Sequence, residues 1–212
     1  MKTFINAQSA FEYYYSFISL GLDFSNTKAI LNEGFYILNP LDNEINISWR
    51  KWNKEYAIKE WNWYLSGNPS GIEIAKSAKI WLNCLDEKGN VNSNYGFQWS
   101  RNNQIDYVID ELKINPQSRR ASISLYDGKE HHLYKRDTIC TYAINFTIVN
   151  SRLNMSVLMR SNDLWYGFCN DQYCFSLLQK MVAEKLNIEI GTYFHFVNNF
   201  HLYLNKLNKN RI

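Results

Sequence analysis

Two strand-like segments that meet across a very short turn limit the folds open to this chain. CTYAINFTIV (residues 140–149) and RLNMSVLM (residues 152–159) are rich in β-forming residues and are joined by a tight Asn-Ser-Arg turn. ASISLYD (residues 121–127) precedes them, and GTYFHFV (residues 191–197) is a further strand candidate. Paired strands are therefore the centre of the expected fold.

Helical patterns lie on both sides of these strands. The first places aromatic side chains at helical spacing and ends at Gly21, and the second has Asn53 as its N-cap and Gly67 after its end. Residues 28–38 are expected to be extended and to stop before Pro40. This mixture predicts an α+β fold with one main sheet. The expected helices are residues 9–21, 53–67, 102–113 and 171–186.

The composition indicates one globular domain, residues 1–212, because the chain has three prolines and no low-complexity linker. Hydrophobic residues at 46% and aromatic residues at 16% exclude a disordered chain. Lysines are scattered and the net charge is only +3, so direct contact with nucleic acid is not expected. No run reaches the ~18 apolar residues of a membrane span, and no secretory pattern opens the chain, which predicts a cytoplasmic protein.

Four cysteines occur without the spacing of metal ligands, so we expect no metal and, in a reducing compartment, no disulfide. By default each is a small buried apolar residue. They are Cys84, Cys140, Cys169 and Cys174.

The segment MRSNDLWYGFCNDQY (residues 159–173) carries the most specific chemistry. Arg160 and Ser161 follow an apolar strand, where an arginine fork beside a hydroxyl suits an oxyanion such as phosphate. Asp171 opens an aromatic-rich helix, where a carboxyl group suits a flat ligand that offers hydrogen-bond donors. Together they predict a nucleotide site.

Six motifs in order resemble the thymidylate synthase superfamily over roughly residues 50–205, whereas the first 45 residues match poorly. They are EWNWYLSG, KIWLNCLDEKGNVNSNYGFQW ending in Tyr-Gly, NPQSRR, DTIC, MRSND and GTYFHFVNNFHLY. The resemblance implies a large mixed β-sheet with packed helices and a homodimer formed through the sheet face. GNVNSNYG, MRSND and GFCND are most similar to the phage-type deoxycytidylate hydroxymethylases.

The resemblance implies three catalytic residues. Cys140 would be the nucleophile that adds to carbon 6 of the pyrimidine, with thiolate character supplied by nearby arginines. Glu60 would organise water and proton transfer, and Tyr95 would assist removal of the carbon 5 proton. The alternatives are a buried cysteine at a strand start, a surface glutamate and a packed tyrosine.

The resemblance also assigns residues to the nucleotide. Arg160 and Ser161 would hold the phosphate, and an arginine pair would reach it from the other subunit, although such a pair is often a solvated turn. A histidine and a tyrosine near the end of the chain would bind the sugar 3′-hydroxyl. These partners are Arg119, Arg120, His201 and Tyr203.

Asp171 stands where ordinary thymidylate synthases have asparagine, whose amide complements uracil. A protonated aspartate can donate to the ring nitrogen of cytosine and accept from its amino group, and an ionised one can pair with protonated cytosine. Against uracil an ionised carboxylate would leave a polar group unpaired at a cost of ~1–3 kcal/mol. The alternative is an N-cap aspartate, although Asn170 could fill that role.

The folate side would include Trp81, Asp163 and Gly167. Where ordinary synthases pack a second tryptophan this chain has Cys84, and it stops at Ile212 soon after the His-x-Tyr motif. Both differences favour a wetter pocket, in which water adds to the intermediate in place of hydride. Thymidylate synthases carry an N-terminal arginine loop that binds phosphate, but the matching segment of this chain offers only Lys28. The phosphate would therefore be bound by fewer cations, or by Arg50 and the arginine pair of the partner subunit.

We therefore expect an enzyme that uses 5,10-methylenetetrahydrofolate to add a hydroxymethyl group to carbon 5 of dCMP. It would act in the cytoplasm, which is the cytoplasm of the host cell if the protein is phage-encoded. The alternatives are a thymidylate synthase or hydroxymethylase acting on dUMP, and an inactive homologue that binds nucleotides. No membrane partner is expected.

Overall fold

A computed structural model describes residues 1–134 and 136–208 of the chain, so Ile212 lies outside the described residues. Its centre is an eight-stranded mixed sheet with the order β1-β3-β8-β6-β5-β4, to which β2 adds beside β3 and β7 beside β8. The strands are β1 (Lys2–Phe4), β2 (Leu22–Phe24), β3 (Thr27–Ile37), β4 (Ser122–Ser124), β5 (Thr141–Val149), β6 (Arg152–Met159), β7 (Asn162–Asp163) and β8 (Glu189–Tyr203).

The predicted hairpin is confirmed as β5 and β6, which pair antiparallel. Asn150 and Ser151 both have positive φ, 51° and 59°. Two consecutive residues in this conformation make a turn whose twist matches that of the flanking strands. The next pairing, between β6 and β8, is parallel, and the intervening chain crosses back through the longest helix of the described chain. The α+β class is therefore confirmed.

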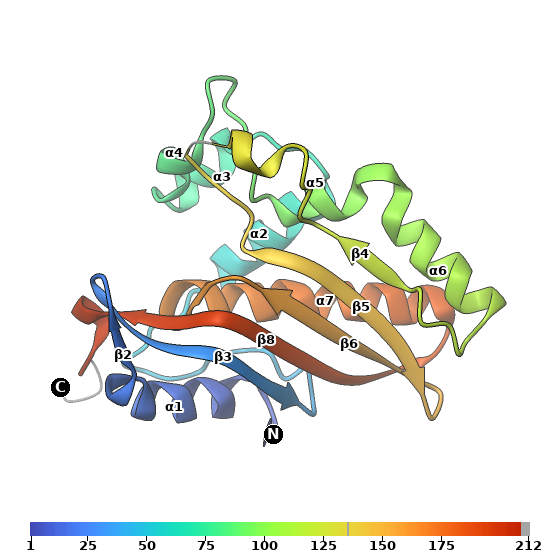
Figure 1. The fold of residues 1–212 in the computed structure, drawn as a ribbon, viewed down its shortest axis with the longest axis horizontal. Helices are drawn as coiled ribbons and strands as arrows, with labels where there is room; N and C mark the ends of the chain where they lie inside the picture. Colours follow the sequence, from blue (N-terminus) through green and yellow to red (C-terminus); the bar gives the residue numbers. More distant parts are fainter. Residues whose placement is uncertain (135, 209–212) are drawn as a thin grey trace.

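The helices are α1 (Ala7–Phe17), α2 (Lys54–Leu65), α3 (Ile72–Ser77), α4 (Trp81–Cys84), α5 (Tyr95–Ser100), α6 (Gln104–Ile114) and α7 (Cys169–Leu186). In Figure 1, α7 runs behind the sheet, α1 lies along the β3 side and α6 along the β4 side. Asn53 caps α2 as expected, because its side chain accepts a hydrogen bond from the backbone N–H of Tyr56.

The core forms between α7 and the face of the sheet that α7 covers. Apolar side chains of α1, α7 and the middle strands meet there, including the fully buried Phe35, Phe168 and Phe200. The buried amide of Gln179 on α7 donates to two strand carbonyls, Leu153 O and Thr192 O, and so joins helix to sheet. This close packing fixes the position of α7, and with it the side chains of its first turn, which include Asp171.

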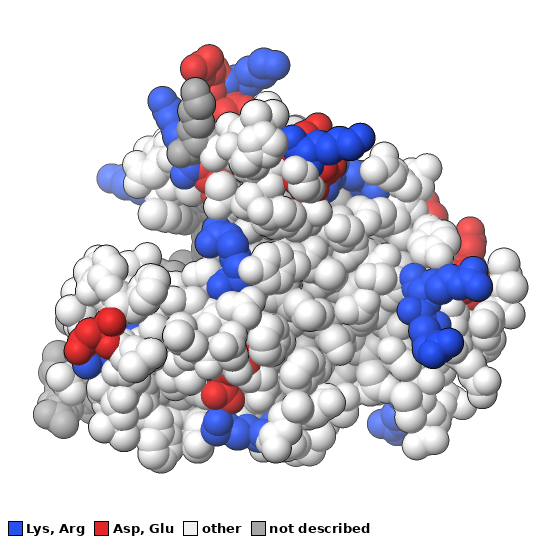
Figure 2. Space-filling model, viewed as in Figure 1, with Lys and Arg blue, Asp and Glu red and all other residues white. Residues whose placement is uncertain are grey.

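Within residues 1–134 and 136–208, no helix covers the opposite face of the sheet (Figure 1). On β6, partly exposed residues alternate with buried ones, and two of them pair with aromatic residues of β8 on the open face. Figure 2 shows this face: charged side chains lie mainly along its margins, and its middle is largely uncharged. The partly exposed residues of β6 and β8 on this open face are Asn154, Ser156, Leu158, Phe194 and Phe196.

The structure differs from the sequence expectations at several boundaries. Gly21 ends the first helical segment with φ −69°, so it is not a left-handed cap. Its small size matters instead, because a Cβ there would lie 2.5 Å from the carbonyl oxygen of Ala29 on β3. The helix α7 begins at Cys169, two residues earlier than expected, because a wider helical turn (Leu164–Phe168) leads into it. The strand candidate at residues 191–197 is part of a longer strand, β8, which runs from Glu189 to Tyr203.

Candidate active site

A cavity of about 1030 Å³ lies between the helical segments that follow α2 and the ends of the central strands. Its walls come from α2, α4, the start of α5, the segment before β5, the Leu164–Phe168 turn and the end of β8. Nine residues given a catalytic or binding role from the sequence line this single cavity: Arg50, Glu60, Trp81, Tyr95, Cys140, Asp163, Gly167, Asp171 and Tyr203.

Cys140 lies immediately before β5 and is partly buried. Burial raises the pKa of its thiol to about 11, although the guanidinium of Arg160 acts in the opposite direction. Arg160 therefore acts in the direction expected from the sequence, but it does not make the sulfur a thiolate in this state of the protein. Burial outweighs the arginine, and the cysteine is a neutral thiol at pH 7.

Arg160 contacts the segment that carries Cys140. Its Nε donates to the carbonyl of Ile139 at 2.9 Å, and its Nη2 donates to the carbonyl and hydroxyl of Thr138 at 3.0 and 2.7 Å. Neither Arg160 nor Ser161 is among the residues that line the cavity. The structure thus shows Arg160 as an anchor for the cysteine segment, and the phosphate role expected from the sequence is untested.

Glu60 is buried on α2 and is only 4% exposed, so the alternative of a surface glutamate is wrong. The hydroxyl of Tyr64, one turn further along the helix, donates to its Oε1 at 2.7 Å. Burial raises the pKa of Glu60, while the hydroxyls of Tyr64 and Tyr56 lower it. Tyr56, one turn before, accepts a hydrogen bond from Nε1 of Trp81 at 2.7 Å. A continuous set of polar groups therefore joins Glu60 to Trp81.

Tyr95 is the first residue of α5 and faces the cavity beside Glu60, Asp171 and Cys140. Burial raises its pKa well above the usual value, and the acidic neighbours raise it further. The adjacent Gly96 allows this placement, because a Cβ there would lie 1.9 Å from the carbonyl oxygen of Tyr64. The Tyr-Gly pair thus reflects contact between two helix backbones.

Asp171 is the third residue of α7, and the N-cap alternative is wrong. The N-cap position belongs to Phe168, without a side-chain cap, and the carbonyl oxygen of the Asn170 side chain accepts from Trp52 Nε1. The Asp171 carboxyl group instead accepts a 2.7 Å hydrogen bond from the amide of Asn162. Burial first and then the nearby Glu60 raise the pKa of Asp171 well above its usual value, which favours the neutral acid.

Asp163 caps the turn that leads into α7. Its carboxylate accepts from the backbone N–H groups of Trp165 at 3.2 Å and Tyr166 at 2.6 Å. Burial raises its pKa, and these two N–H groups and His201 oppose that effect. Gly167 follows on the same turn, where a side chain would meet the Asn162–Asp171 pair.

Comparison with known proteins identifies the family. The family model for thymidylate synthase matches residues 41–211. The chain belongs to the thymidylate synthase family. It is 30% identical over 167 residues to thymidylate synthase of Bacillus atrophaeus, which covers 74% of this chain and 73% of that protein. It is equally similar to thymidylate synthase 1 of Bacillus amyloliquefaciens (74% and 72%), and 28% identical over 193 residues to the Bacillus licheniformis enzyme (84% and 67%).

Thymidylate synthase family members are one-carbon transferases, so the coarse functional class expected from the motifs is confirmed. Within residues 1–134 and 136–208, no helix is long and apolar enough to span a membrane. The same residues contain no group of three or more histidine, cysteine or acidic side chains arranged to hold a metal.

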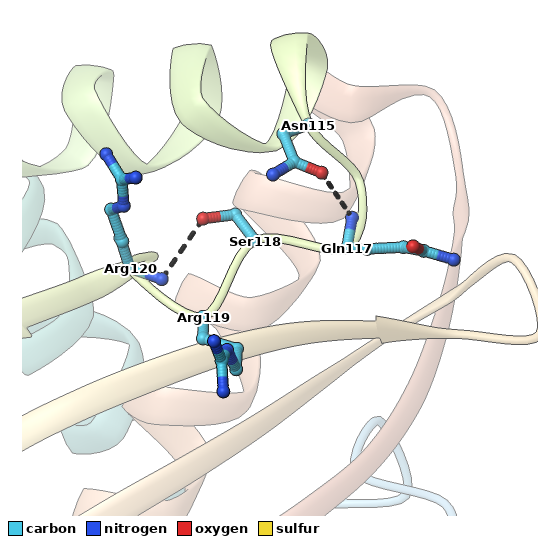
Figure 3. A pocket seen from close by; sticks show the side chains of 5 residues that line it. All are labelled: Asn115, Gln117, Ser118, Arg119 and Arg120. Carbon is cyan, nitrogen blue, oxygen red and sulfur yellow. Dashed lines mark hydrogen bonds between the residues drawn. The ribbon is translucent and has the colours of Figure 1, made fainter.

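The arginine pair of this family member lies outside the main cavity. Arg119 and Arg120 are exposed on the loop after α6, where they line a separate hollow of about 550 Å³. Hydrogen bonds from Gln117 N to Asn115 Oδ1 and from Arg120 N to Ser118 Oγ, both 3.1 Å, shape this loop. Figure 3 shows the two arginine side chains pointing in different directions. Within one chain they do not meet Cys140.

His201 is also not among the cavity-lining residues, although its neighbour Tyr203 is. Its Nδ1 lies 3.3 Å from the carbonyl oxygen of Asn199, and its ring packs edge-on against Tyr203. Lys28, the cation expected to replace the N-terminal arginine loop, is paired with Asp23 at 2.7 Å. Arg50 lines the cavity, but its guanidinium stacks 4.6 Å from the Trp165 ring and donates to the Trp165 carbonyl.

Two polar residues near the site were not singled out from the sequence. Tyr56 could have been found, because it lies one helical turn before Glu60 on the same face of α2. Asn162 could not, because its contact with Asp171 depends on how β7 lies beside the first turn of α7.

Proposed function

We propose that this family member transfers a one-carbon unit to carbon 5 of a pyrimidine deoxynucleotide, and that its preferred substrate and product are dCMP and 5-hydroxymethyl-dCMP. The observation that carries the choice of base is the buried carboxyl group of Asp171 on the cavity wall, whose pKa burial raises and which stands in place of the asparagine amide of ordinary synthases. A neutral acid whose proton faces the ring nitrogen donates to that nitrogen and accepts from the amino group of cytosine, whereas the proton on the other oxygen would match uracil.

Cys140 begins the reaction by adding its sulfur to carbon 6 of the pyrimidine, and the electron pair moves to carbon 5 as the thiol proton leaves. Because the thiol is neutral in the free protein, it loses this proton when the substrate is bound. Glu60 and Tyr95 line the same cavity and supply the acid–base groups. The raised pKa of Glu60 suits a group that both accepts and returns a proton.

The residues of the cavity fit a reduced folate as the one-carbon donor. Its volume of about 1030 Å³ lies just above the ~300–1,000 Å³ usual for ligand pockets, which suits two molecules bound together. Trp81 offers an aromatic surface, Asp163 a carboxylate and Gly167 an open stretch of backbone on that side. When bound, 5,10-methylenetetrahydrofolate supplies the carbon that carbon 5 attacks.

The open face of the sheet supports a homodimer as part of the proposal. Its middle carries few charged side chains (Figure 2), and Leu158, Phe194 and Phe196 lie on it, as expected of an interface between identical chains. Exposed Arg119 and Arg120 are then free to reach the phosphate in the partner's cavity. Sedimentation velocity should give a dimer, and a monomer at micromolar concentration would contradict this part of the proposal.

The second candidate is methylation of dUMP, because the relatives that align over most of the chain are thymidylate synthases. The two candidates differ in whether hydride or water reaches the intermediate. Cys84, in place of a second tryptophan, favours water. The third candidate is an inactive homologue that binds nucleotides. The presence of Cys140, Glu60 and Tyr95 in one cavity argues against it, because a protein that only binds would need none of them.

The deciding experiment is mass spectrometry of the products after incubation with methylenetetrahydrofolate and equal amounts of dCMP and dUMP. A hydroxymethyl gain on dCMP is the expected result, and a methyl gain on dUMP supports the second candidate. The Cys140→Ser variant serves as the control, because it should bind nucleotide without turnover. Binding without turnover in the unchanged protein would support the inactive homologue.

A further inference from the structure

Asn162 lies directly behind the carboxyl group of Asp171. It is the first residue of β7, opposite Phe200 of β8, and is only 3% exposed. Its Nδ2 donates to Oδ2 of Asp171 at 2.7 Å. In the described part of the chain no other hydrogen bond reaches this carboxyl group. The base-reading side chain is therefore held by one partner.

Met159 determines which way the Asn162 amide faces. Nδ2 of Asn162 also lies 3.0 Å from Sδ of Met159. A thioether sulfur can accept a hydrogen bond but cannot donate one. The end of the Asn162 amide that faces both the sulfur and Asp171 must therefore be the NH₂ group. A rotation of the amide by 180° would place its oxygen against the sulfur, and both atoms are acceptors.

The fixed NH₂ group decides which oxygen of neutral Asp171 carries the proton. Oδ2 already accepts from Asn162, and a proton on Oδ2 would compete with that donor. The acidic proton therefore belongs on Oδ1. Asp171 presents a donor at Oδ1 and a remaining acceptor lone pair at Oδ2.

The position of this proton distinguishes the two bases. Cytosine has an acceptor at N3 beside a donor at the 4-amino group, whereas uracil has a donor at N3 beside an acceptor at position 4. A neutral carboxyl group can pair with either base, but the proton must sit on opposite oxygens in the two cases. We propose that Asn162 is a specificity-determining positioning residue, which holds Asp171 in the one protonated arrangement that matches a single base edge. This inference rests on the proposed role of Asp171 in binding the base.

Gly167 keeps the approach to this pair open. A Cβ at this position would lie 3.2 Å from Oδ1 of Asn162 and 3.3 Å from Oδ2 of Asp171. Oδ1 of Asn162 is itself buried without a hydrogen-bond partner among the described residues. The absent side chain leaves space on the cavity side, where a ligand donor can reach the acceptor atoms.

The test compares kcat/KM for dCMP and dUMP in the unchanged protein and in Asn162→Ala and Asn162→Leu. The leucine variant keeps most of the side-chain volume and removes the donor. Because either proton position then becomes available, the ratio of the two values should move toward the disfavoured base by about tenfold in both variants. A purely structural role would lower both values together and leave the ratio unchanged.

Gln179→Leu is the matched control, because it removes an equally buried amide that bonds only to strand carbonyls of Leu153 and Thr192. It should lower the melting temperature without changing the ratio. A ratio that stays within about twofold of the unchanged protein in both Asn162 variants would overturn the inference.

The outcome is separable from that of the proposed function. If the unchanged protein converts only dUMP, the assignment of dCMP fails, yet the Asn162 variants should still change the ratio. If neither nucleotide is converted, the ratio of their dissociation constants from calorimetry replaces the kinetic ratio. An unchanged ratio by either measurement counts against Asn162.

Discussion

The hydroxyl of Tyr64 lies 2.7 Å from Oε1 of Glu60, one turn apart on α2 and buried from water. This hydrogen bond lowers the pKa of Glu60, against the larger effect of burial, which raises it. The pair therefore influences the pH range over which Glu60 is ionised.

Tyr64→Phe should raise the pKa of Glu60, because the ionised carboxylate loses a donor. Glu60 is then protonated up to a higher pH, so the acidic limb of the kcat/KM profile should move to higher pH. A pH–rate profile measures the shift. Tyr14→Phe is the control, since that hydroxyl bonds to Glu33, away from the cavity. An acidic limb that does not move would show that Glu60 does not control it.

His195 should make the protein less stable in acid. Burial among Phe35, Phe168 and Phe200 lowers its pKa to about 3, from 6.5 when unfolded. Between these values the unfolded chain binds a proton that the folded chain does not, so this contribution to stability falls as pH decreases. The loss is about 1.4 kcal/mol per pH unit, or about 2 kcal/mol from pH 6.5 to pH 5.

Denaturant unfolding at pH 7 and pH 5 measures this effect. The double variant Tyr193→Phe/His195→Phe removes both members of the buried 2.7 Å hydrogen bond and should flatten the pH dependence. His132→Phe, at an exposed position in the short 3₁₀ helix His131–Leu133, should leave the slope as it is. Equal slopes in all three proteins would be evidence against His195 as the source.

Gly96→Ala should be strongly destabilising. The added Cβ would lie 1.9 Å from the carbonyl oxygen of Tyr64, and backbone cannot move aside cheaply. Overpacking of this kind costs about 1–3 kcal/mol or more. Gly128→Ala provides the comparison, because no described atom lies within 4 Å of a Cβ there. Melting temperatures test the pair, and equal values would contradict the close approach of α5 to α2.

Arg160→Gln should slow alkylation of Cys140 by iodoacetamide. Arg160 lowers the pKa of this thiol, so its loss should raise the pKa and reduce the thiolate fraction at a given pH. Mass spectrometry of the Cys140 peptide across a pH series gives the rate. Arg152→Gln removes a surface ion pair with Glu189 and should have no effect. Faster alkylation in Arg160→Gln would mean that loosening of the Thr138–Ile139 contacts dominates.

The hairpin, the long helix and the capped α2 could be predicted because each depends on local sequence. Asn150 and Ser151 form the turn, and Asn53 supplies a cap to residues that directly follow it. The strands β1 and β2 could not be predicted, because each has only three residues and so shows no hydrophobic alternation. They are extended because they pair with β3, a contact that the local sequence does not reveal.

The candidate site could be predicted in part, for a similar reason. Motif residues such as Glu60, Tyr95 and Cys140 are recognisable one by one, and the fold brings them to one cavity. The neutral state of Cys140 was not predictable, because it depends on how much protein surrounds the sulfur. The bond between Asn162 and Asp171 likewise exists only once β7 and α7 are packed together.

The two walls of the cavity are attached to elements that differ in their resistance to local opening. Asp171 belongs to α7, whose backbone amides are covered by the sheet along most of the helix and should exchange with deuterium only when the molecule unfolds as a whole. Trp81 belongs to α4, a four-residue helix with no buried side chain, whose amides should exchange through small, frequent fluctuations. We therefore expect the wall proposed to read the base to stay formed while the wall proposed for the folate fluctuates. The nucleotide should then bind to a formed surface before the folate wall becomes ordered around it.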